Sequence, residues 1–500
     1  MSSAASLKEK TAKGLFWGGL GSSVQQMLGG VFGLITARIL NAEDYGLIGM
    51  LAIFNGIVTI LQESGFTAAL ANRQEIKHED YNAVFWFSTL TSIVAYVILF
   101  FCAPLIAFFY RKPALIPLSR ILFLGFVFGG MGVALNAHLN KNLKVKERAV
   151  GDIIAIIVSG TLGVILALNG YAAIGLAIQT VTYVGVSVFF RFYYSSWRPT
   201  FQFNFFPLRE MFGFSSKLIL TNFLFQINNN MLSVIMGRFY NPNQLGFYTQ
   251  GQKWMGMASQ VVNGMISYIA QPVFVEVTDN GERQRHIFRK MVRFGAFISL
   301  PAMAGLALIA KEFIWIFLGE KWMPSIPYLQ ILCIWGSCNY LWTLYIYLLM
   351  AHGKSGAYLL GTVLTGIAQL LLIWGVYPLG TYWMVIGFVA VSCLSLFYWH
   401  KIAGQLISLS IWQVLKDIAP YLAITGTSVL IAWFVAHFTS DRYISFFVKS
   451  FLYIGCYLII SKILDSTMLK ESLQHPFLFS FMNQLKIKKF HLYQLSCYCL

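Results

Sequence analysis

The sequence predicts an all-α membrane protein of about fourteen transmembrane helices, because apolar residues dominate the chain and charged residues are scarce. Of the 500 residues, 57% are hydrophobic, 11% are charged, and the mean hydropathy is +0.66. Soluble globular proteins carry roughly 25% charged residues. The chain therefore lacks the polar surface that a water-soluble body of this size needs, and we expect a lipid bilayer to surround most of it.

Apolar stretches of about 20 residues follow one another, separated by polar, glycine or proline residues. We expect membrane spans at 14–40, 45–70, 82–110, 117–137, 149–169, 171–194, 211–237, 244–272, 290–311, 325–351, 356–377, 380–400, 417–438 and 443–464. Lys8, Lys10 and Lys13 precede the first span as in a signal peptide, but the apolar run is too long for one, so we expect no cleavage.

The placement of the basic residues predicts the orientation of these spans. With an even number of spans and a cytoplasmic N-terminus, inner loops and ends hold about 26 of the 36 lysines and arginines, and outer loops about six. We therefore expect both termini in the cytoplasm. The formal charge of +17 follows from this bias, so nucleic acid is not an expected partner.

An internal repeat divides the chain after six spans. Five identities fall within about 20 positions when the sequence is shifted by 200 residues; these are Gln26 on Gln226, Ile35 on Ile235, Arg38 on Arg238, Asn41 on Asn241 and Gly46 on Gly246. Because six is an even number, the two copies form a parallel repeat. We expect an N-lobe at 1–194, an interfacial cytoplasmic linker at 195–210, a C-lobe at 211–403, two further helices at 404–465 and a cytoplasmic tail at 466–500.

Polar and small side chains recur on one face of the first two spans of each half. At membrane depth such a face meets protein or a water-filled cavity, because polar groups in lipid are costly. The faces are Ser22, Gln26, Gly29, Gly33 and Ala37; Asn55, Thr59, Glu63 and Thr67; Asn222, Gln226, Asn229, Ser233 and Gly237; and Thr249, Lys253, Gly256, Gln260, Asn263 and Ser267. At the glycines and serines, close helix packing explains the pattern equally well.

Two charges, Lys253 and Glu63, lie deep within their spans. A charge near the bilayer centre costs about 2.5–3.5 kcal/mol on insertion scales. One interpretation is a structural Lys–Glu pair. The other is a site for an anionic substrate, with the acid nearby for proton or cation coupling. Arg38, Arg238 and Arg120 lie near outer ends of spans, where they either reach the headgroups or stand at the mouth of a cavity.

Three stretches resemble the polysaccharide-transporter, or Wzx-type, flippases of the MOP (multidrug/oligosaccharidyl-lipid/polysaccharide) exporter superfamily. They are ARILNAEDYGLIGM with the following LQESGFTAALANRQ, then GRFYNPNQLGFYTQGQKW, and FLGEKWMPSIPYLQILCI. The resemblance covers about residues 8–465 and is strongest to the branch with colanic-acid-type exporters. It implies a MATE-like fold, with two six-helix lobes around a central cavity that opens alternately to each side, plus two further helices.

The resemblance also implies transport of an undecaprenyl-diphosphate-linked oligosaccharide across a bacterial inner membrane, with polysaccharide polymerase and glycosyltransferases as possible partners. The candidate cavity residues are Lys253, Glu63, Arg38, Arg238, Arg120, Gln26, Asn222, Gln226, Asn229, Gln260 and Asn263. Cations would hold the diphosphate, and amides would hold the sugars. The pair Glu63-Ser64 stands where the family frequently has Asp-Leu, which leaves the role of the acid open.

Two other functions compete with this interpretation. A MATE-like, cation-coupled drug antiporter should have an acid-rich cavity, whereas basic groups outnumber acids among the deep charges here. An oligosaccharide polymerase or ligase needs a large outer loop, and the sequence shows neither such a loop nor a nucleophile–base or paired-carboxylate arrangement. The seven cysteines form no CxxC pair or Cys/His cluster, so no metal or cofactor is expected.

Overall fold

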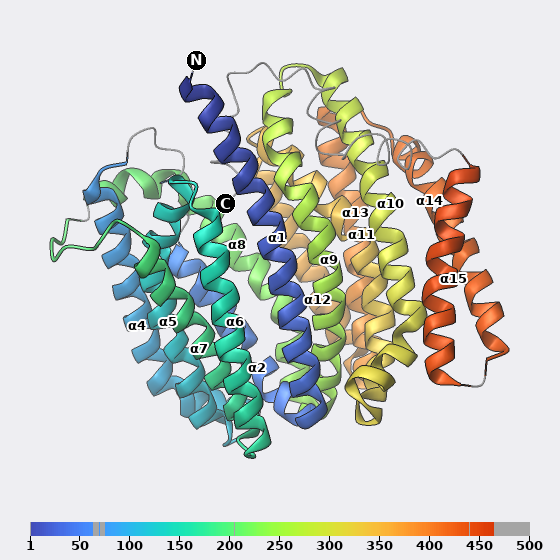
Figure 1. Ribbon diagram of the computed structural model, residues 1–500, viewed down its shortest axis with the longest axis horizontal. Coiled ribbons are helices and arrows are strands. Elements are labelled where there is room, and N and C mark those ends of the chain that lie inside the picture. Colours follow the sequence, from blue (N-terminus) through green and yellow to red (C-terminus); the bar gives the residue numbers. More distant parts are fainter. Residues whose placement is uncertain (1, 64–69, 71–75, 205, 440, 465–500) are drawn as a thin grey trace. The chain divides into compact units, whose positions relative to one another are not determined.

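The computed structural model describes residues 2–63, 70, 76–204, 206–439 and 441–464, and most of these residues lie in helices (Figure 1). Eleven helices in this part of the chain are long and apolar enough to cross a membrane. This confirms the all-α membrane architecture. Helices α1, α8 and α9 are not among the eleven, and they carry polar faces expected from the sequence. The expected total of fourteen crossings therefore depends on these three helices and remains a prediction.

The chain divides into two compact units, with the boundary between Thr249 and Gln250. The first unit holds α1 (Ser2–Ile39), α2 (Ala42–Glu63), α4 (His78–Tyr110), α5 (Leu115–Lys141), α6 (Val145–Leu168), α7 (Ala172–Tyr194) and α8 (Phe206–Phe239). Helix α4 packs on α5, α5 and α6 pack on α7, α1 packs on α6, and α2 packs on α8. Figure 1 shows α4, α5, α7 and α6 side by side, in blue to green. Residues 64–69, the end of the expected span 45–70, lie outside the described residues.

Residues 195–204, in the segment expected as an interfacial linker, pack against α4 within the first unit. Trp197 packs in an aromatic core with Phe85, and its indole nitrogen donates a hydrogen bond to His78 Nδ1 at 3.0 Å. The Thr200 amide donates to Asn82 Oδ1 at 2.9 Å, and the Trp86 indole donates to the Thr200 carbonyl at 2.7 Å. His78, Asn82 and Trp86 are four residues apart, so one face of α4 holds the linker.

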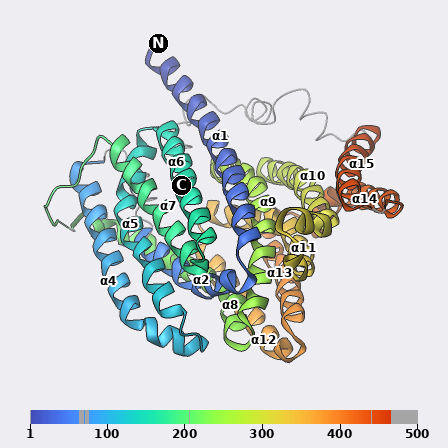
Figure 2. The same ribbon diagram turned by 60° about the horizontal axis from the view of Figure 1, so that its bottom comes forward.

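The second unit holds most of α9 (Pro242–Glu276), which begins in the first unit. It continues with α10 (Gly281–Phe313), a π-helical turn (Ile314–Leu318), a 3-10 turn (Glu320–Ser325), α11 (Ile326–Ala351), α12 (Ser355–Val376), α13 (Thr381–Leu406), α14 (Ile411–His437) and α15 (Arg442–Ile463). Helix α10 packs on α11, α14 and α15, and α13 packs on α11 and α12. Figures 1 and 2 show α15 lying beside α14.

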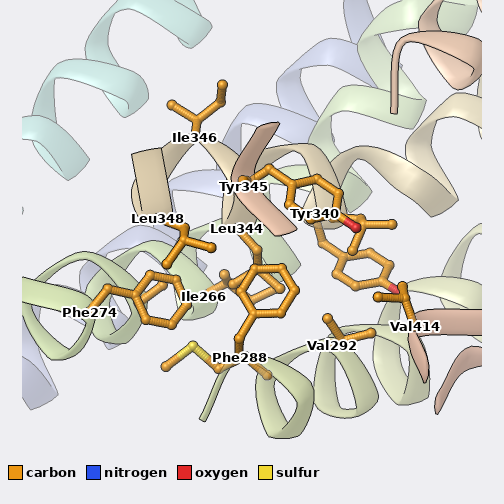
Figure 3. Close-up of a cluster of buried hydrophobic side chains, with 14 of the residues drawn as sticks. Ile266, Phe274, Phe288, Val292, Tyr340, Leu344, Tyr345, Ile346, Leu348 and Val414 are labelled. Carbon is orange, nitrogen blue, oxygen red and sulfur yellow. The ribbon is translucent and has the colours of Figure 1, made fainter. Parts of the chain in front are cut away.

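Aromatic rings hold the core of the second unit together (Figure 3). Phe288 of α10 stacks on Phe274 of α9 at 5.9 Å and on Tyr345 of α11 at 5.3 Å. Val414 of α14 belongs to the same cluster. Burial of each large side chain contributes about 1.5–3 kcal/mol, so this cluster fixes one face of α9 against α10 and α11.

Candidate functional site

The polar face of α9 points away from the core of its unit. Val262 and Ile266 are buried in the aromatic cluster, whereas Gln260 is exposed. A methyl group added to Gly256 or Gly264 would meet nothing within 4 Å. Small residues that pack helices closely leave no such room. The face around Lys253 and Gln260 therefore borders open space.

Lys253 is half-buried on this face. Its ammonium lies 5.4 Å from the ring centroid of the neighbouring Trp254, within the range of a cation–π contact. No carboxylate among the described residues lies within ion-pair distance of Lys253. The side chain of Glu63, at the end of α2, lies outside the described residues, so the Lys253–Glu63 pair stays untested.

Two to three turns beyond Lys253 along α9, amide and hydroxyl groups converge. Asn263 Nδ2 donates to Ser259 Oγ at 3.0 Å, and Asn339 Nδ2 of α11 donates to the same oxygen at 3.4 Å. The Asn263 Oδ1 atom is buried and has no hydrogen-bond partner among the described residues. Sequence reasoning missed Asn339, although an asparagine inside the apolar stretch LCIWGSCNYLW was a signal that could have identified it.

The predicted amides of α1 and α8 belong to the first unit. Gln26 is half-buried on α1, and Asn222 is exposed near the middle of α8. Gln226 packs against α2, because a methyl group on Gly56 would lie 2.9 Å from its amide. Asn229 is half-buried one turn beyond Gln226. The structure thus brings Gln226 of α8 to α2, but it does not place these amides relative to Lys253 in the second unit.

The three predicted arginines lie in the first unit at helix ends or near them. Arg38 is exposed in the last turn of α1, and Arg238 is half-buried in the last turn of α8. The Arg238 guanidinium lies 5.5 Å from the ring centroid of Phe109 on α4. Arg120 lies 4.3 Å above the Phe100 ring, so its guanidinium faces α4.

Three buried carboxylates, which the sequence did not single out, have basic partners on neighbouring helices or one turn away. Asp417 of α14 accepts from Arg289 at 2.7 and 3.0 Å, and Glu312 of α10 accepts from Lys449 of α15 at 2.7 Å. Asp152 lies between Arg148 at 3.8 Å and Arg191 at 3.5 Å and accepts from Ser187. Each carboxylate is at most 8% exposed. Each of these carboxylates thus has one or two basic partners, whereas Lys253 has no carboxylate partner among the described residues.

No group of three or more histidine, cysteine, aspartate or glutamate side chains suited to a metal ion occurs among the described residues. The described residues offer a polar α9 face, an amide cluster beside it and a lysine that has no carboxylate partner among them. Such a face suits noncovalent binding of an anionic, hydroxyl-rich molecule.

Comparisons with known proteins agree on a polysaccharide biosynthesis family. A family model described as "Polysaccharide biosynthesis protein" matches residues 35–327, more than half of the chain. The lipopolysaccharide biosynthesis protein WzxC of Escherichia coli is 26% identical over 335 residues, which cover 66% of this chain and 68% of WzxC.

Two solved structures share the fold. The lipid II flippase MurJ, in an inward closed conformation, has a TM-score of 0.67 at 15% identity and covers 89% of this chain and 98% of its own. An inward-facing multidrug-resistance MATE transporter of the MOP superfamily has a TM-score of 0.62 at 18% identity and covers 77% of this chain and 96% of its own. The chain therefore has the expected MATE- and MurJ-like fold, and it belongs to the polysaccharide biosynthesis family of multi-pass membrane transporters, which are not enzymes.

Proposed function

We propose that this protein carries an undecaprenyl-diphosphate-linked oligosaccharide, the repeat unit of an O-antigen, capsule or exopolysaccharide, across the bacterial inner membrane by alternating access. The lipid tail can remain in the bilayer while the headgroup crosses, so the protein needs a polar surface for the headgroup and no covalent chemistry. The family supports the class of transport, and WzxC is named for lipopolysaccharide biosynthesis.

The observation that carries this proposal is the position of Lys253. It lies on a polar face beside open space, and no described carboxylate neutralises it. A positive charge kept at membrane depth is costly, so it is expected to serve a ligand. The diphosphate supplies the negative charge, and Gln260, Asn263 and Asn339 offer amides to the sugars. The other candidate residues, Gln26, Asn222, Gln226, Asn229, Arg38, Arg238, Arg120 and Glu63, complete the proposed path.

We further propose fourteen crossings arranged as two six-helix lobes, 1–194 and 211–403, followed by the helix pair within 404–465. The helix packing supports a parallel repeat. In the first half α4 packs on α5, α5 on α7, and α6 on α7; in the second half α10 packs on α11, α11 on α13, and α12 on α13. Helix ends also correspond, since α1 ends at Ile39 and α8 at Phe239.

Both termini are proposed to be cytoplasmic, and the polymerase and glycosyltransferases of the pathway are proposed partners. Reporter fusions placed after Lys146 and after Asn483 should both give cytoplasmic signals. An external signal at either position would overturn this topology.

The alternative, a cation-coupled drug antiporter, shares the fold, and the fold alone does not separate the two. The charges of the described residues favour the flippase. An antiporter for cationic drugs needs a free acid in its path, whereas the buried acids described in α6, α10 and α14 are each paired with a base. Glu63, which the sequence places within the second expected span, is the acid to test for that role.

The experiment that tests the proposal is substitution of Lys253 in a strain that lacks its own carrier. Charge-assisted hydrogen bonds contribute about 1.5–3 kcal/mol each, so Lys253→Ala should lower polymer export about tenfold or more. Lys253→Arg should retain part of the activity, because it keeps the charge but changes the shape.

The membrane level of each variant must be measured alongside export. Lys401→Ala, at an exposed site on α13, is the matched control and should behave as the wild type. Normal export by Lys253→Ala would disprove the substrate role. Loss of that variant from the membrane would instead identify Lys253 as a structural residue.

A further inference from the structure

Two glycines allow the start of α2 and the start of α9 to touch backbone to backbone. A Cβ atom on Gly46 would lie 2.0 Å from the carbonyl oxygen of Pro242. A Cβ atom on Gly246 would lie 1.8 Å from the carbonyl oxygen of Ala42. Real Cβ atoms essentially never come closer than 3.0 Å to such neighbours. Only glycine fits at either position.

The contact is reciprocal. Gly46 and Gly246 are 200 residues apart, as are their partners Ala42 and Pro242. In a two-fold contact, residue i of one partner meets residue j of the other and the reverse is also true. A residue on the axis meets its own counterpart, and Gly49 does so: a Cβ atom there would lie 2.7 Å from the side chain of Thr249.

Buried apolar side chains surround the crossing. Leu47 and Met50 of α2 and Leu245 and Tyr248 of α9 are at most 7% exposed. All of these residues belong to the first compact unit. The crossing is therefore tightly packed, and it lies at the helix ends that the proposed topology puts outside the cytoplasm.

We propose that this glycine crossing between α2 and α9 is the outer gate of the transporter, and that it separates and re-forms in every transport cycle. The inference rests on the proposed function, because only a carrier with alternating access needs such a gate. Contact energy between atoms declines within about 1 Å of separation. The backbone contact at the two glycines can therefore be broken by a small movement of one helix from the other.

The two-fold relation makes the proposal specific. Corresponding residues of both repeats form the gate. The same substitution in either repeat should therefore open the gate to the same extent. Gly46→Ala and Gly246→Ala each place a methyl group against a backbone carbonyl, which cannot move aside as a flexible side chain can. Gly455→Ala, on α15, is the matched control, because a methyl group there meets nothing within 4 Å.

The gate can be observed directly by spin labels at the exposed residues Asn41 and Asn241. Double electron–electron resonance on the reconstituted full chain should give a short and a long distance. Gly46→Ala and Gly246→Ala should both enrich the long distance, and Gly455→Ala should not. A single short distance in the wild type and both alanine variants would overturn the gate, whatever the substrate is.

A reversible lock then connects the gate to transport. In a variant without the seven native cysteines, Gly49→Cys and Thr249→Cys should form a disulfide upon oxidation. Movement of a lipid-linked oligosaccharide should stop with the disulfide formed and return after reduction. Undiminished transport with the disulfide complete would overturn the proposal. If even the reduced protein moves no lipid-linked oligosaccharide while two spin-label distances are present, the gate stands and the proposed substrate is wrong.

Discussion

Helices α4 and α10 are the third helices of the two proposed repeats, and a proline interrupts each of them. A proline has no amide hydrogen, so the carbonyl four residues earlier loses its helical donor. In α4 Pro104 leaves the Phe100 carbonyl without a donor, and Arg120 Nε of α5 reaches this oxygen at 3.5 Å. In α10 Pro301 leaves the Phe297 carbonyl without a donor, and the Tyr457 hydroxyl of α15 donates to it at 2.7 Å.

The carbonyl that each proline leaves without a helical donor thus finds a different donor in each unit. Arg120 approaches from within the first unit, through a long bond and a contact with the Phe100 ring. In the second unit α15 supplies two hydroxyls, since Tyr453 also donates to the Pro301 carbonyl at 2.9 Å. Lys449 of α15 pairs with Glu312 near the end of α10.

This difference indicates what the last two helices do. Lys449, Tyr453 and Tyr457 are four residues apart and form one face of α15, which follows α10 along its length. Asp417 fixes α14 to the same helix through Arg289. The pair α14–α15 therefore supports α10, whereas α4 packs on α5, α2 and α8 of its own unit.

The largest effect is expected from removing the charge partner of a buried acid on α10. Lys449→Met leaves Glu312 buried without a countercharge, which should cost about 3–5 kcal/mol of stability. Thermal unfolding of the purified protein in detergent measures this loss. Lys112→Met is the matched control, because Lys112 and Glu43 form an exposed pair in the first unit worth about 0–1 kcal/mol.

A second change shows whether charge causes that loss. Adding Glu312→Gln to Lys449→Met removes the unpaired carboxylate and should recover part of the stability. Equal melting temperatures for Lys449→Met and the Lys112→Met control would show that α15 does not support α10 by this pair.

A smaller loss should follow from Tyr457→Phe. The variant keeps the ring but leaves the Phe297 carbonyl without a donor, at a cost of about 1–3 kcal/mol. Tyr443→Phe, an exposed tyrosine at the start of the same helix, should leave the melting temperature unchanged. Equal melting temperatures for the two variants would show that the Tyr457 hydroxyl does not stabilise the proline break in α10.

Arg120→Met tests the other half of the comparison. Its bond to the Phe100 carbonyl is long and the side chain is half-buried, so the loss of stability should be no more than about 1 kcal/mol, the value of a cation–π contact. A strong fall in export at normal membrane level would assign Arg120 to the substrate path. A melting temperature below that of Tyr457→Phe would make it a structural residue instead.

The smallest effect concerns the pH dependence of stability at the start of α10. Gln284 there accepts a hydrogen bond from His352 Nε2 at 2.8 Å, as a neutral imidazole allows. Burial, and then the nearby Lys354, lower the pKa of His352. At low pH the unfolded chain therefore binds a proton at His352 more readily than the folded protein does. The stability that neutral His352 contributes is present above the ordinary pKa of 6.5 and is lost as the pH falls. A His352→Gln variant should show a slightly weaker decline of melting temperature between pH 7 and about 5; an identical decline would contradict it.

Much of the fold follows from the sequence, because lipid imposes a simple rule on span length and charge. The turn of RILNAEDYGL and its copy RFYNPNQLGF also predicted equivalent helix ends at Ile39 and Phe239. Prolines inside α4 and α10 identify the carbonyls that lose a donor. The partners of those carbonyls were not predictable, since Tyr457 lies 160 residues from Phe297.

The candidate site was less predictable than the fold. Lys253 and Glu63 stood out because they interrupt apolar segments, whereas Glu312 and Asp417 lie nearer helix ends and were passed over. Which acid is paired depends on tertiary contacts, such as the one that joins Glu312 to Lys449 across 137 residues. Asn339 was missed because one polar residue in an apolar helix has no periodic pattern to mark its face.

The central claim is movement of a lipid-linked oligosaccharide, and purified protein in liposomes tests it most directly. Vesicles would contain an undecaprenyl-diphosphate-linked oligosaccharide, and a membrane-impermeant glycosidase added outside would report on the outer leaflet. The account predicts that wild-type protein exposes the inner-leaflet substrate to cleavage, while Lys253→Ala does so about tenfold more slowly. Cleavage that stops at the outer-leaflet fraction, as in empty liposomes, together with uptake of a cationic drug by the same vesicles, would contradict the claim and favour the antiporter.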